Sequence, residues 1–299
     1  IYYNIHLAKS VYRISRESLE RAKKNREIVI GRTMSGRASK YDNIKSMADI
    51  SARVPAVNDA AANLTTVIHS LITLLGLQAD EAGGDISSFK VDISSDIFKR
   101  EYSRLDHRLL VGRMLKTHPA LGKLGSEVEA SKIRTDMLRK LYYPEISAFL
   151  SYAKSGHGDS AFISSENIDN FGLLGFSVNL PIFDGGLRRE NINQARLLKN
   201  NAELQLSKKK KEIVLELETA VARYNERLKT LEANRKAVKL AEESFEMSRN
   251  LFKSGYLSIT DLNDAELRLT RQKISLEKTL VDIEIIRAEI EKLAGSLNE

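Results

Sequence analysis

The segment Ser254-Gly255-Tyr256-Leu257-Ser258-Ile259-Thr260-Asp261 corresponds, at an offset of 219 residues, to Ser35-Gly36-Arg37-Ala38-Ser39-Lys40-Tyr41-Asp42. The same offset aligns Gly76 with Gly295, so each copy runs 40 residues from one glycine to the next. Because chance matches rarely preserve register and hydrophobic phase together, the sequence predicts a duplicated structural unit. The apolar positions that share this phase are Ile50/Leu269, Val57/Leu276, Ala61/Leu280, Leu64/Ile283, Val67/Ile286 and Leu71/Ile290.

Each copy is predicted to form a helix, a tight turn and a return helix. Gly36 and Gly255 follow the first helix, where a glycine in the left-handed conformation commonly ends a helix. Ser39 and Ser258 each precede an aspartate by three residues, which is the spacing of a capping box that opens the next helix. The apolar spacing of mostly three and four residues is typical of a coiled-coil seam.

The helix before the second turn is predicted to be very long. Residues 187–250 contain neither proline nor glycine, and these 64 residues at 1.5 Å each would span about 95 Å. Such a helix needs equally long neighbours to bury its apolar stripe. In the first copy, Pro55 is expected to kink the return helix. The predicted stripe consists of Ile192, Ala195, Ala202, Ile213, Leu217, Val221, Leu228, Leu231, Val238, Phe245 and Leu251.

Between the copies the apolar period changes from helical to alternating. Residues 119–141 are predicted to be a helix that starts at Pro119, and residues 78–106 to be loop and short elements. Residues 145–154 and 172–180 alternate apolar and polar positions over the length of a strand that crosses a membrane. The residues predicted to face lipid are Ile146, Leu150, Leu174, Phe176, Val178 and Leu180.

Composition narrows the function classes. The chain has 47 Lys and Arg against 40 Asp and Glu, but the signs are mixed, and the dense run Lys208–Lys211 has no interleaved aromatic residues. This pattern favours solvated helix faces over nucleic-acid binding. Cysteine is absent and the five histidines lack metal-binding spacing, so no metal, cofactor or catalytic residue is predicted. No apolar run is long enough for a transmembrane helix, and no signal peptide is recognised at Ile1.

Several motifs, taken in order, are similar to those of a known family. They are His118-Pro119-Ala120-Leu121 with Val128-Glu129-Ala130, Tyr143-Pro144-Glu145-Ile146, Leu180-Pro181-Ile182-Phe183-Asp184-Gly185-Gly186 with Gln194-Ala195, and the turn Ser254–Asp261. Together with the repeat, they resemble the TolC-like outer membrane efflux protein family (outer membrane factors). The resemblance covers essentially the whole chain.

The resemblance implies a fold that is mainly α with a β-hairpin. Long antiparallel coiled-coil helices would form a trimeric α-barrel in the periplasm, and the strands would contribute to a shared transmembrane β-barrel. A homotrimer, outer-membrane lipid, a periplasmic adaptor (membrane fusion) protein and an inner-membrane transporter are the implied partners, without nucleic acid. The implied role is an outer-membrane duct of a Gram-negative efflux pump or type I secretion system.

The family also has a second β-hairpin and a signal peptide in its first half, so the chain is expected to lack an N-terminal part. Two strands from each of three subunits would be too few for a barrel with a lumen. The predicted divisions are a first-repeat helical hairpin (1–77), a linker or equatorial region (78–118), a helix leading to the barrel (119–143), an outer-membrane β-hairpin (144–183) and a second-repeat long helical hairpin (184–299).

The resemblance places Asp261 and Asp264 at the narrow periplasmic entrance. Three subunits would then create a ring of carboxylates that attracts cations. Acidic residues at a helix start also interact favourably with the helix dipole, which is the simpler interpretation of Asp261. Asp42 is its repeat counterpart. Lys45 occupies the repeat position of Asp264, which suggests a Lys45–Asp264 ion pair.

The two turns are expected to dock the adaptor. Some family members carry an arginine two residues after the second turn glycine and use it to lock the closed state. Leu257 stands there in this chain, so any lock must be built differently. The residues predicted to dock the adaptor are Ser35, Gly36, Ser39, Ser254, Gly255, Tyr256, Leu257 and Ser258.

Two other interpretations remain at this stage. A soluble coiled-coil scaffold or membrane-shaping helical protein would fit the basic charge balance. It would have no need of two alternating strands at 145–180. An enzyme is disfavoured, because long coiled coils rarely enclose a catalytic pocket.

Overall fold

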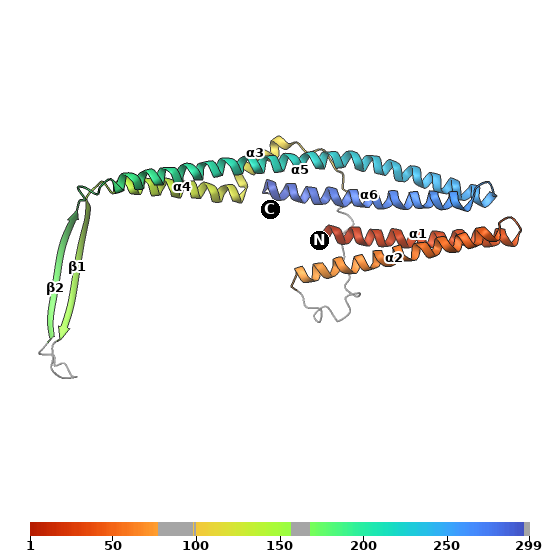
Figure 1. Cartoon of the computed structure of the whole chain (residues 1–299), viewed down its shortest axis with the longest axis horizontal. Coiled ribbons are helices and arrows are strands. Elements are labelled where there is room, and N and C mark those ends of the chain that lie inside the picture. Colours follow the sequence, from red (N-terminus) through yellow and green to blue (C-terminus); the bar gives the residue numbers. More distant parts are fainter. Residues whose placement is uncertain (77–97, 99, 157–167, 296–299) are drawn as a thin grey trace. The chain divides into compact units, whose positions relative to one another are not determined.

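The computed structural model describes residues 1–76, 98, 100–156 and 168–295 (Figure 1). These residues fall into two units, one formed by Ile1–Met114 with Leu215–Glu299 and the other by Leu115–Val214. The elements within the described residues are α1 (Tyr2–Met34), α2 (Lys40–Leu74), α3 (His107–Thr117), α4 (Pro119–Lys140), β1 (Glu145–Gly156), β2 (Ile168–Asn179), α5 (Leu187–Ser254) and α6 (Ile259–Ala294).

The two sequence repeats form two helical hairpins in the first unit. Helix α1 pairs with α2, while the C-terminal part of α5 is followed by α6, and α1 also packs against α6. The predicted helix–turn–helix organisation of each copy is therefore confirmed. No helix in the described part of the chain is both long enough and apolar enough to cross a membrane.

Both turns have the same backbone geometry. In the first, Gly36 N–H donates to Thr33 O at 3.0 Å and Arg37 N–H donates to Arg32 O at 2.7 Å. In the second, Gly255 N–H donates to Phe252 O at 3.1 Å and Tyr256 N–H donates to Leu251 O at 2.9 Å. This pair of bonds defines the Schellman motif, which requires a left-handed residue. Gly36 and Gly255 supply it with φ values of 70° and 90°.

The ends of the return helices also follow the sequence. Gly76 and Gly295 have φ values of 69° and 74°, as expected of terminating glycines. Pro55 removes one backbone donor, yet α2 continues unbroken from Lys40 to Leu74. The missing hydrogen bond is thus tolerated within this helix. Helix α3 was not predicted, and the predicted loop residues 78–97 and 99 lie outside the described residues.

The repeated apolar seam is buried more deeply in the second copy than in the first. In α6 the seam residues Leu269, Ile283, Ile286 and Ile290 are buried, whereas their counterparts in α2 are only half-buried. The difference follows from the neighbours of each helix. Helix α6 packs against α1 and also contacts α5, for example where Asn234 Nδ2 donates to Thr279 Oγ1 at 2.9 Å.

The stripe predicted for α5 is largely confirmed but shifts by one position at the end. Leu251 is 40% exposed, and Phe252 is buried in its place. Phe252 contacts the turn-proximal core, so the tertiary environment selects the larger side chain. The predicted stripe residues that are buried are Ile192, Ala195, Ile213, Leu217, Val221, Leu231 and Phe245.

The second unit carries the β-hairpin. Helix α4 begins at Pro119, with His118 as N-cap residue whose Nδ1 accepts from Ala120 N–H at 3.3 Å. Strands β1 and β2 pair antiparallel from Glu145↔Asn179 to Gly156↔Ile168, and both extend beyond the predicted limits. The predicted strands and their antiparallel arrangement are confirmed.

Candidate functional site

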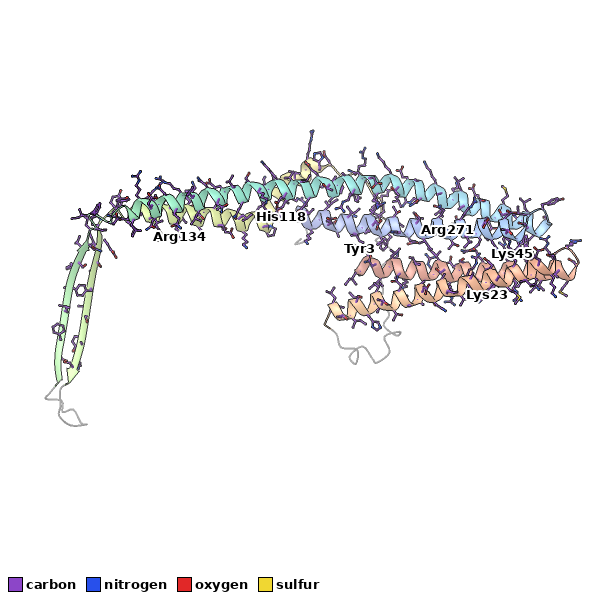
Figure 2. All side chains as sticks on the ribbon, in the orientation of Figure 1. Tyr3, Lys23, Lys45, His118, Arg134 and Arg271 are labelled. Carbon is purple, nitrogen blue, oxygen red and sulfur yellow. The ribbon has the colours of Figure 1, made fainter. Side chains whose placement is uncertain are left out.

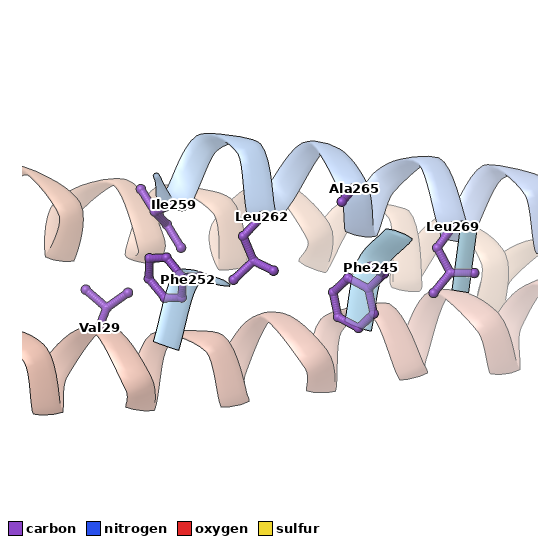
Figure 3. Packing of buried hydrophobic residues seen from close by; sticks show 7 residues of the cluster. All are labelled: Val29, Phe245, Phe252, Ile259, Leu262, Ala265 and Leu269. Atoms are coloured by element: carbon purple, nitrogen blue, oxygen red, sulfur yellow. The ribbon is translucent and has the colours of Figure 1, made fainter. Parts of the chain in front are cut away.

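A compact apolar core lies next to the second turn. We call it the tip cluster (Figure 3). Its central residue, Leu262, is fully buried, and Val29 of α1 is the one member from the first repeat. Burial of these side chains holds the two hairpins together close to their turns. The members are Val29, Phe245, Phe252, Ile259, Leu262, Ala265 and Leu269.

The two aspartates predicted to open the return helices both act as helix caps. Asp42 forms a complete capping box, since Ser39 N–H donates to its Oδ2 at 3.0 Å and Asp42 N–H donates to Ser39 Oγ at 3.1 Å. In the second copy Asp261 N–H donates to Ser258 Oγ at 3.2 Å, and the Ser258 hydroxyl donates to Asp261 Oδ2 at 2.6 Å. These carboxylates therefore already have a structural role.

Asp264 differs from Asp261, because its side chain is exposed and is not part of the cap. Lys45 lies close to the second turn, but its Nζ donates to Thr260 Oγ1 and also lies 5.7 Å from the centre of the Tyr41 ring (Figure 2). Among the salt bridges of the described residues there is no Lys45–Asp264 pair; the contact partner of Lys45 on α6 is Thr260 instead.

The residues predicted to dock a partner are grouped at the two turns. Ser35, Gly36 and Ser39 are exposed in the first turn, and Leu257 is half-buried against the tip cluster in the second. Tyr256 is 84% exposed, which is unusual for a large aromatic side chain without a partner protein. The remaining predicted residues, Ser254, Gly255 and Ser258, are exposed as well.

Arg32 joins the two turns and was missed in the sequence. One of its guanidinium nitrogens donates to Phe252 O at 2.8 Å, and another donates to Arg37 O at 3.1 Å. The guanidinium carbon also lies 4.7 Å from the centre of the Phe252 ring, within range of a cation–π interaction. Its only sequence signal was a basic residue in the last turn of a helix, which is common.

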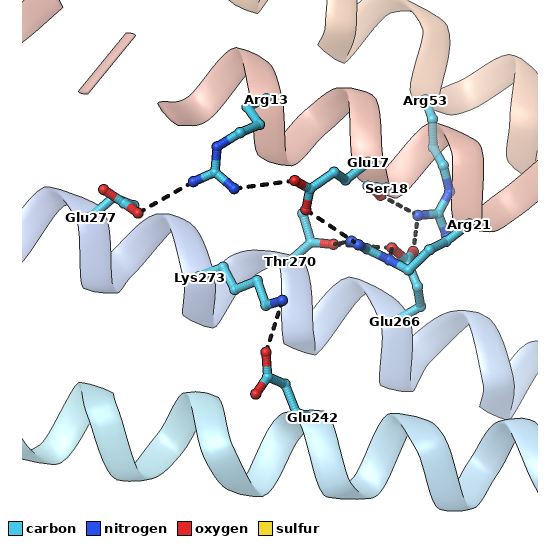
Figure 4. Close-up of polar contacts among 10 residues, drawn as sticks. All are labelled: Arg13, Glu17, Ser18, Arg21, Arg53, Glu242, Glu266, Thr270, Lys273 and Glu277. Carbon is cyan, nitrogen blue, oxygen red and sulfur yellow. Dashed lines mark hydrogen bonds and ion pairs between the residues drawn. The ribbon is translucent and has the colours of Figure 1, made fainter. Parts of the chain in front are cut away.

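A buried group of charges lies further along the same helices. We call it the Glu266 cluster (Figure 4). Glu266 on α6 is completely buried, and its Oε1 accepts from Arg21 Nε at 3.0 Å. Its Oε2 pairs with Arg53 of α2, which is also buried. The six residues are Ser18 and Arg21 of α1, Asp49 and Arg53 of α2, and Glu266 and Thr270 of α6.

Each arginine of the Glu266 cluster has a second acidic partner. Arg53 Nε donates to Asp49 Oδ2 at 3.0 Å, and Arg21 lies 3.8 Å from a carboxylate oxygen of Glu17. Burial lowers the pKa of the Arg21 guanidinium, and Glu17 opposes this effect. The sequence gave no indication of this cluster, because its members lie on three helices and have no characteristic spacing.

A groove of about 780 Å³ follows one side of α1. His6 stacks on Phe98 with ring centres 3.8 Å apart and lies 3.5 Å from a carboxylate oxygen of Glu277. Burial lowers the pKa of His6, opposed by Glu277. The charged residues along the groove are Lys9, Arg13, Arg16, Glu17, Glu20, Arg21, Lys24 and Glu277. The described residues contain no group of three or more His, Asp or Glu that could hold a metal ion.

The β-hairpin of the second unit has one strongly apolar face. The register places Ile146 opposite Val178 and Leu150 opposite Leu174, so these side chains share one face of the sheet. Leu150 and Phe176 are 80% and 76% exposed. Six exposed apolar side chains on one face are typical of a surface that contacts lipid or another protein. They are the predicted residues Ile146, Leu150, Leu174, Phe176, Val178 and Leu180, with Leu180 directly after β2.

The opposite face is closed by an aromatic ring over a glycine. Phe149 pairs with Gly175, and a Cβ at residue 175 would lie 2.3 Å from the tip of the Phe149 ring. Gly175 therefore provides the space in which Phe149 lies flat on the neighbouring strand.

The base of the hairpin is held by Asp184 and Arg188. Asp184 accepts from Arg188 Nε at 2.6 Å and from Gly186 N–H at 3.1 Å. Arg188 in turn donates to Pro181 O at 2.7 Å and to Leu141 O at 3.2 Å. This arrangement explains the Asp-Gly-Gly motif. The carboxylate organises the turn, and Gly185 and Gly186 adopt φ values of 63° and 90°.

The hairpin base is expected to weaken at low pH. The bond from Arg188 lowers the pKa of Asp184 below its usual value of 3.8, helped by the backbone N–H groups of Arg188 and Gly186. A lowered pKa in the folded state adds stability above pH 3.8, and this stability is lost as the pH falls through the folded-state pKa. Asp184→Asn should therefore lower the Tm at pH 6 and have little effect below the folded-state pKa.

Circular dichroism melts between pH 6 and pH 2.5 would measure this difference. Asp136→Asn is the control, because Asp136 lies in the same unit and pairs with Arg139 at 3.4 Å on an exposed helix face. A Tm difference between wild type and Asp184→Asn that does not change with pH would show that the Asp184 charge is unimportant.

Two homologous coiled-coil hairpins, together with a β-hairpin that exposes one apolar face, define a class of long-helix membrane-associated proteins. Residues 110–296 match the family described as outer membrane efflux protein. This match covers more than half of the sequence, and the chain belongs to the outer membrane efflux protein family. The predicted family and the predicted fold class, mainly α with a β-hairpin, are thus confirmed.

Individual relatives agree with this assignment. Nodulation protein T of Rhizobium leguminosarum bv. trifolii is 20% identical over 301 residues, which is 99% of this chain and 60% of that protein. Outer membrane protein TolC of Escherichia coli (strain K12) is 26% identical over 126 residues, covering 42% of this chain and 26% of TolC. The chain thus spans about 60% of the length of Nodulation protein T.

A solved structure shares the fold. The open state of the Neisseria gonorrhoeae MtrE outer membrane channel superposes with a TM-score of 0.76 at 16% identity, covering 98% of this chain and 64% of that one. At this identity the likeness concerns the fold alone.

Proposed function

We propose that this chain is a subunit of an outer-membrane duct that carries substrates from a periplasmic adaptor and an inner-membrane transporter to the exterior. The observation that carries the proposal is the joining of two different surfaces in one chain. A β-hairpin with a continuous apolar face is followed directly by a helix of 68 residues. A lipid-inserted part and a long periplasmic part would use these two elements. The similarity to the MtrE outer membrane channel supports the same role.

The β-hairpin requires further strands if it lies in lipid. Within the described residues the sheet has two strands, so each strand keeps one edge without backbone partners. Unpaired backbone groups are not tolerated in the hydrocarbon region, which makes association with other strands necessary. A homotrimer that closes a shared barrel satisfies both edges. The scaffold alternative offers no reason for an apolar strand face next to the Asp-Gly-Gly turn.

The proposed periplasmic entrance is formed by the tips of the two hairpins. Tyr256 and the exposed serines of both turns would contact the adaptor, and Asp264 would face the passage together with Asp261. Of these two aspartates, Asp264 is the better candidate for a gate, since Asp261 is engaged by Ser258. Lys45 and Asp42 would support the turns from the first hairpin.

Conductance measurements test this assignment. We expect Asp264→Ala in the purified trimer to weaken block by divalent cations about tenfold in planar bilayers, which corresponds to about 1.4 kcal/mol of lost ion binding. The reason is that one substitution removes a carboxylate from every subunit of the proposed ring.

Asp59→Ala serves as the matched control, since Asp59 is an exposed aspartate of α2 well away from the turns. Equal cation block in wild type and Asp264→Ala would remove Asp264 from the gate. A monomer in detergent that forms no channels would disprove the duct itself.

A further inference from the structure

The Glu266 cluster is unusual for the seam of a helical bundle, where apolar residues normally predominate. Glu266 is completely buried, and both of its oxygens are engaged by arginines of the first hairpin. Thr270 Oγ1 adds a hydrogen bond to Oε1 at 3.1 Å. A buried ion pair is seldom a source of net stability, because removing both charges from water cancels most of their attraction. The cluster therefore needs another explanation.

The two repeats differ at the positions that form this cluster. At the offset of 219 residues, the counterpart of Glu266 is Met47, that of Arg53 is Gln272 and that of Arg21 is Leu240. The acid is thus present in the second copy alone, and the two arginines in the first alone. This contrasts with the turns, where Ser, Gly and Asp recur at matching positions.

This asymmetry matters because duplicated hairpins can pair in more than one way. If two first-copy hairpins packed together, Arg21 and Arg53 would face Met47 rather than an acid. If two second-copy hairpins packed together, Glu266 would face Leu240 and Gln272. Each like-with-like pairing would leave a charge buried without a partner, which is strongly unfavourable.

The apolar seam by itself leaves the axial register open. Its residues recur every three or four positions, so a shift of α6 by one heptad would again match apolar with apolar side chains. Such a shift moves the helix by about 10 Å, at 1.5 Å per residue. It would also withdraw Glu266 from Arg53, whereas the apolar contacts would largely be replaced.

We propose that the Glu266 cluster is a specificity device, which selects the pairing of the first hairpin with the second and fixes their axial register. Arg53 and Arg21 recognise Glu266 from two different helices, α2 and α1. The carboxylate is satisfied in one arrangement of the three helices. This role goes beyond duct formation, since it concerns how the two hairpins of one chain find each other.

Distance measurements between spin labels test the proposal directly. The chain has no cysteine, so labels can be attached at Lys24→Cys on α1 and Lys278→Cys on α6, both of which are exposed. Labelled chains would be co-expressed with an excess of unlabelled chains, so that each assembly reports one intramolecular distance. Pulsed electron resonance then gives the distribution of distances in the full assembled protein.

Two variants separate register from stability. Glu266→Gln keeps the shape but removes the charge, and the triple variant Arg21→Leu, Arg53→Leu, Glu266→Leu makes the site apolar. Glu242→Gln is the control, because it breaks the exposed Lys273–Glu242 pair on the same helix pair. We expect a single narrow distance in wild type and control, and a second population displaced by about 10 Å in the apolar variant.

The proposal is overturned if the apolar variant folds and keeps the single wild-type distance, since register would then be set elsewhere. Failure of both variants to fold would overturn it too, because the cluster would then be needed for stability rather than for selection.

Discussion

Leu150→Arg is expected to abolish stable insertion into the outer membrane. Leu150 lies near the middle of β1, opposite Leu174, and is 80% exposed on the apolar face of the hairpin. An arginine at the centre of a lipid-facing strand costs about 2–4 kcal/mol per subunit, so three copies in the proposed trimer would cost about 6–12 kcal/mol. Fractionation of outer membranes, followed by protease treatment of intact cells, would show the loss of the inserted form.

Ser151→Arg provides the matched control for this prediction. Ser151 is the next residue along β1 and points to the opposite face, because side chains alternate along a strand. We expect this variant to insert normally, since the second face would line the passage. If Leu150→Arg inserts as well as Ser151→Arg, the apolar face does not contact lipid.

Arg53→Ala should lower the free energy of unfolding by about 3 kcal/mol, the lower end of the range for breaking a buried ion pair. The substitution leaves the fully buried Glu266 with one cation, Arg21, instead of two. It also leaves the Ser18 hydroxyl without its donor. The remaining Arg21 contact is the reason for choosing the lower end. Urea unfolding followed by circular dichroism, at one fixed protein concentration, would measure the change.

Lys273→Ala is the comparison for Arg53→Ala. Lys273 pairs with Glu242 at 2.8 Å across α6 and α5, but Glu242 is half exposed, so the loss should stay below about 1 kcal/mol. Equal losses in the two variants would contradict the view that burial makes the Glu266 cluster energetically different from surface pairs.

Sequence and structure agree best where the controlling interactions are local. The left-handed glycines, the serine–aspartate caps and the alternating strands were predicted correctly, since each depends on residues within a few positions of one another. Agreement fails where packing decides between neighbouring residues. Leu251 was expected in the stripe of α5, but Phe252 fills the tip cluster.

The site shows the same division. Asp42 and Asp261 could be recognised from their spacing to a serine, whereas Arg32 has no local signature. The Arg32 side chain bonds to a carbonyl 220 residues away, and it takes part in joining the turns where Leu257 has replaced a possible arginine. A single arginine near a helix end cannot be distinguished from many others in the sequence.

The sequence alone determined the duplication, the turns, the helix lengths and the β-hairpin. Each of these follows from backbone preference or from an apolar period, and both are written in neighbouring residues. The tertiary structure alone decided which copy is buried more deeply and which residues cross-link the hairpins. Arg53 and Glu266 lie 213 residues apart, and only the packing of α1, α2 and α6 brings their charges together away from water.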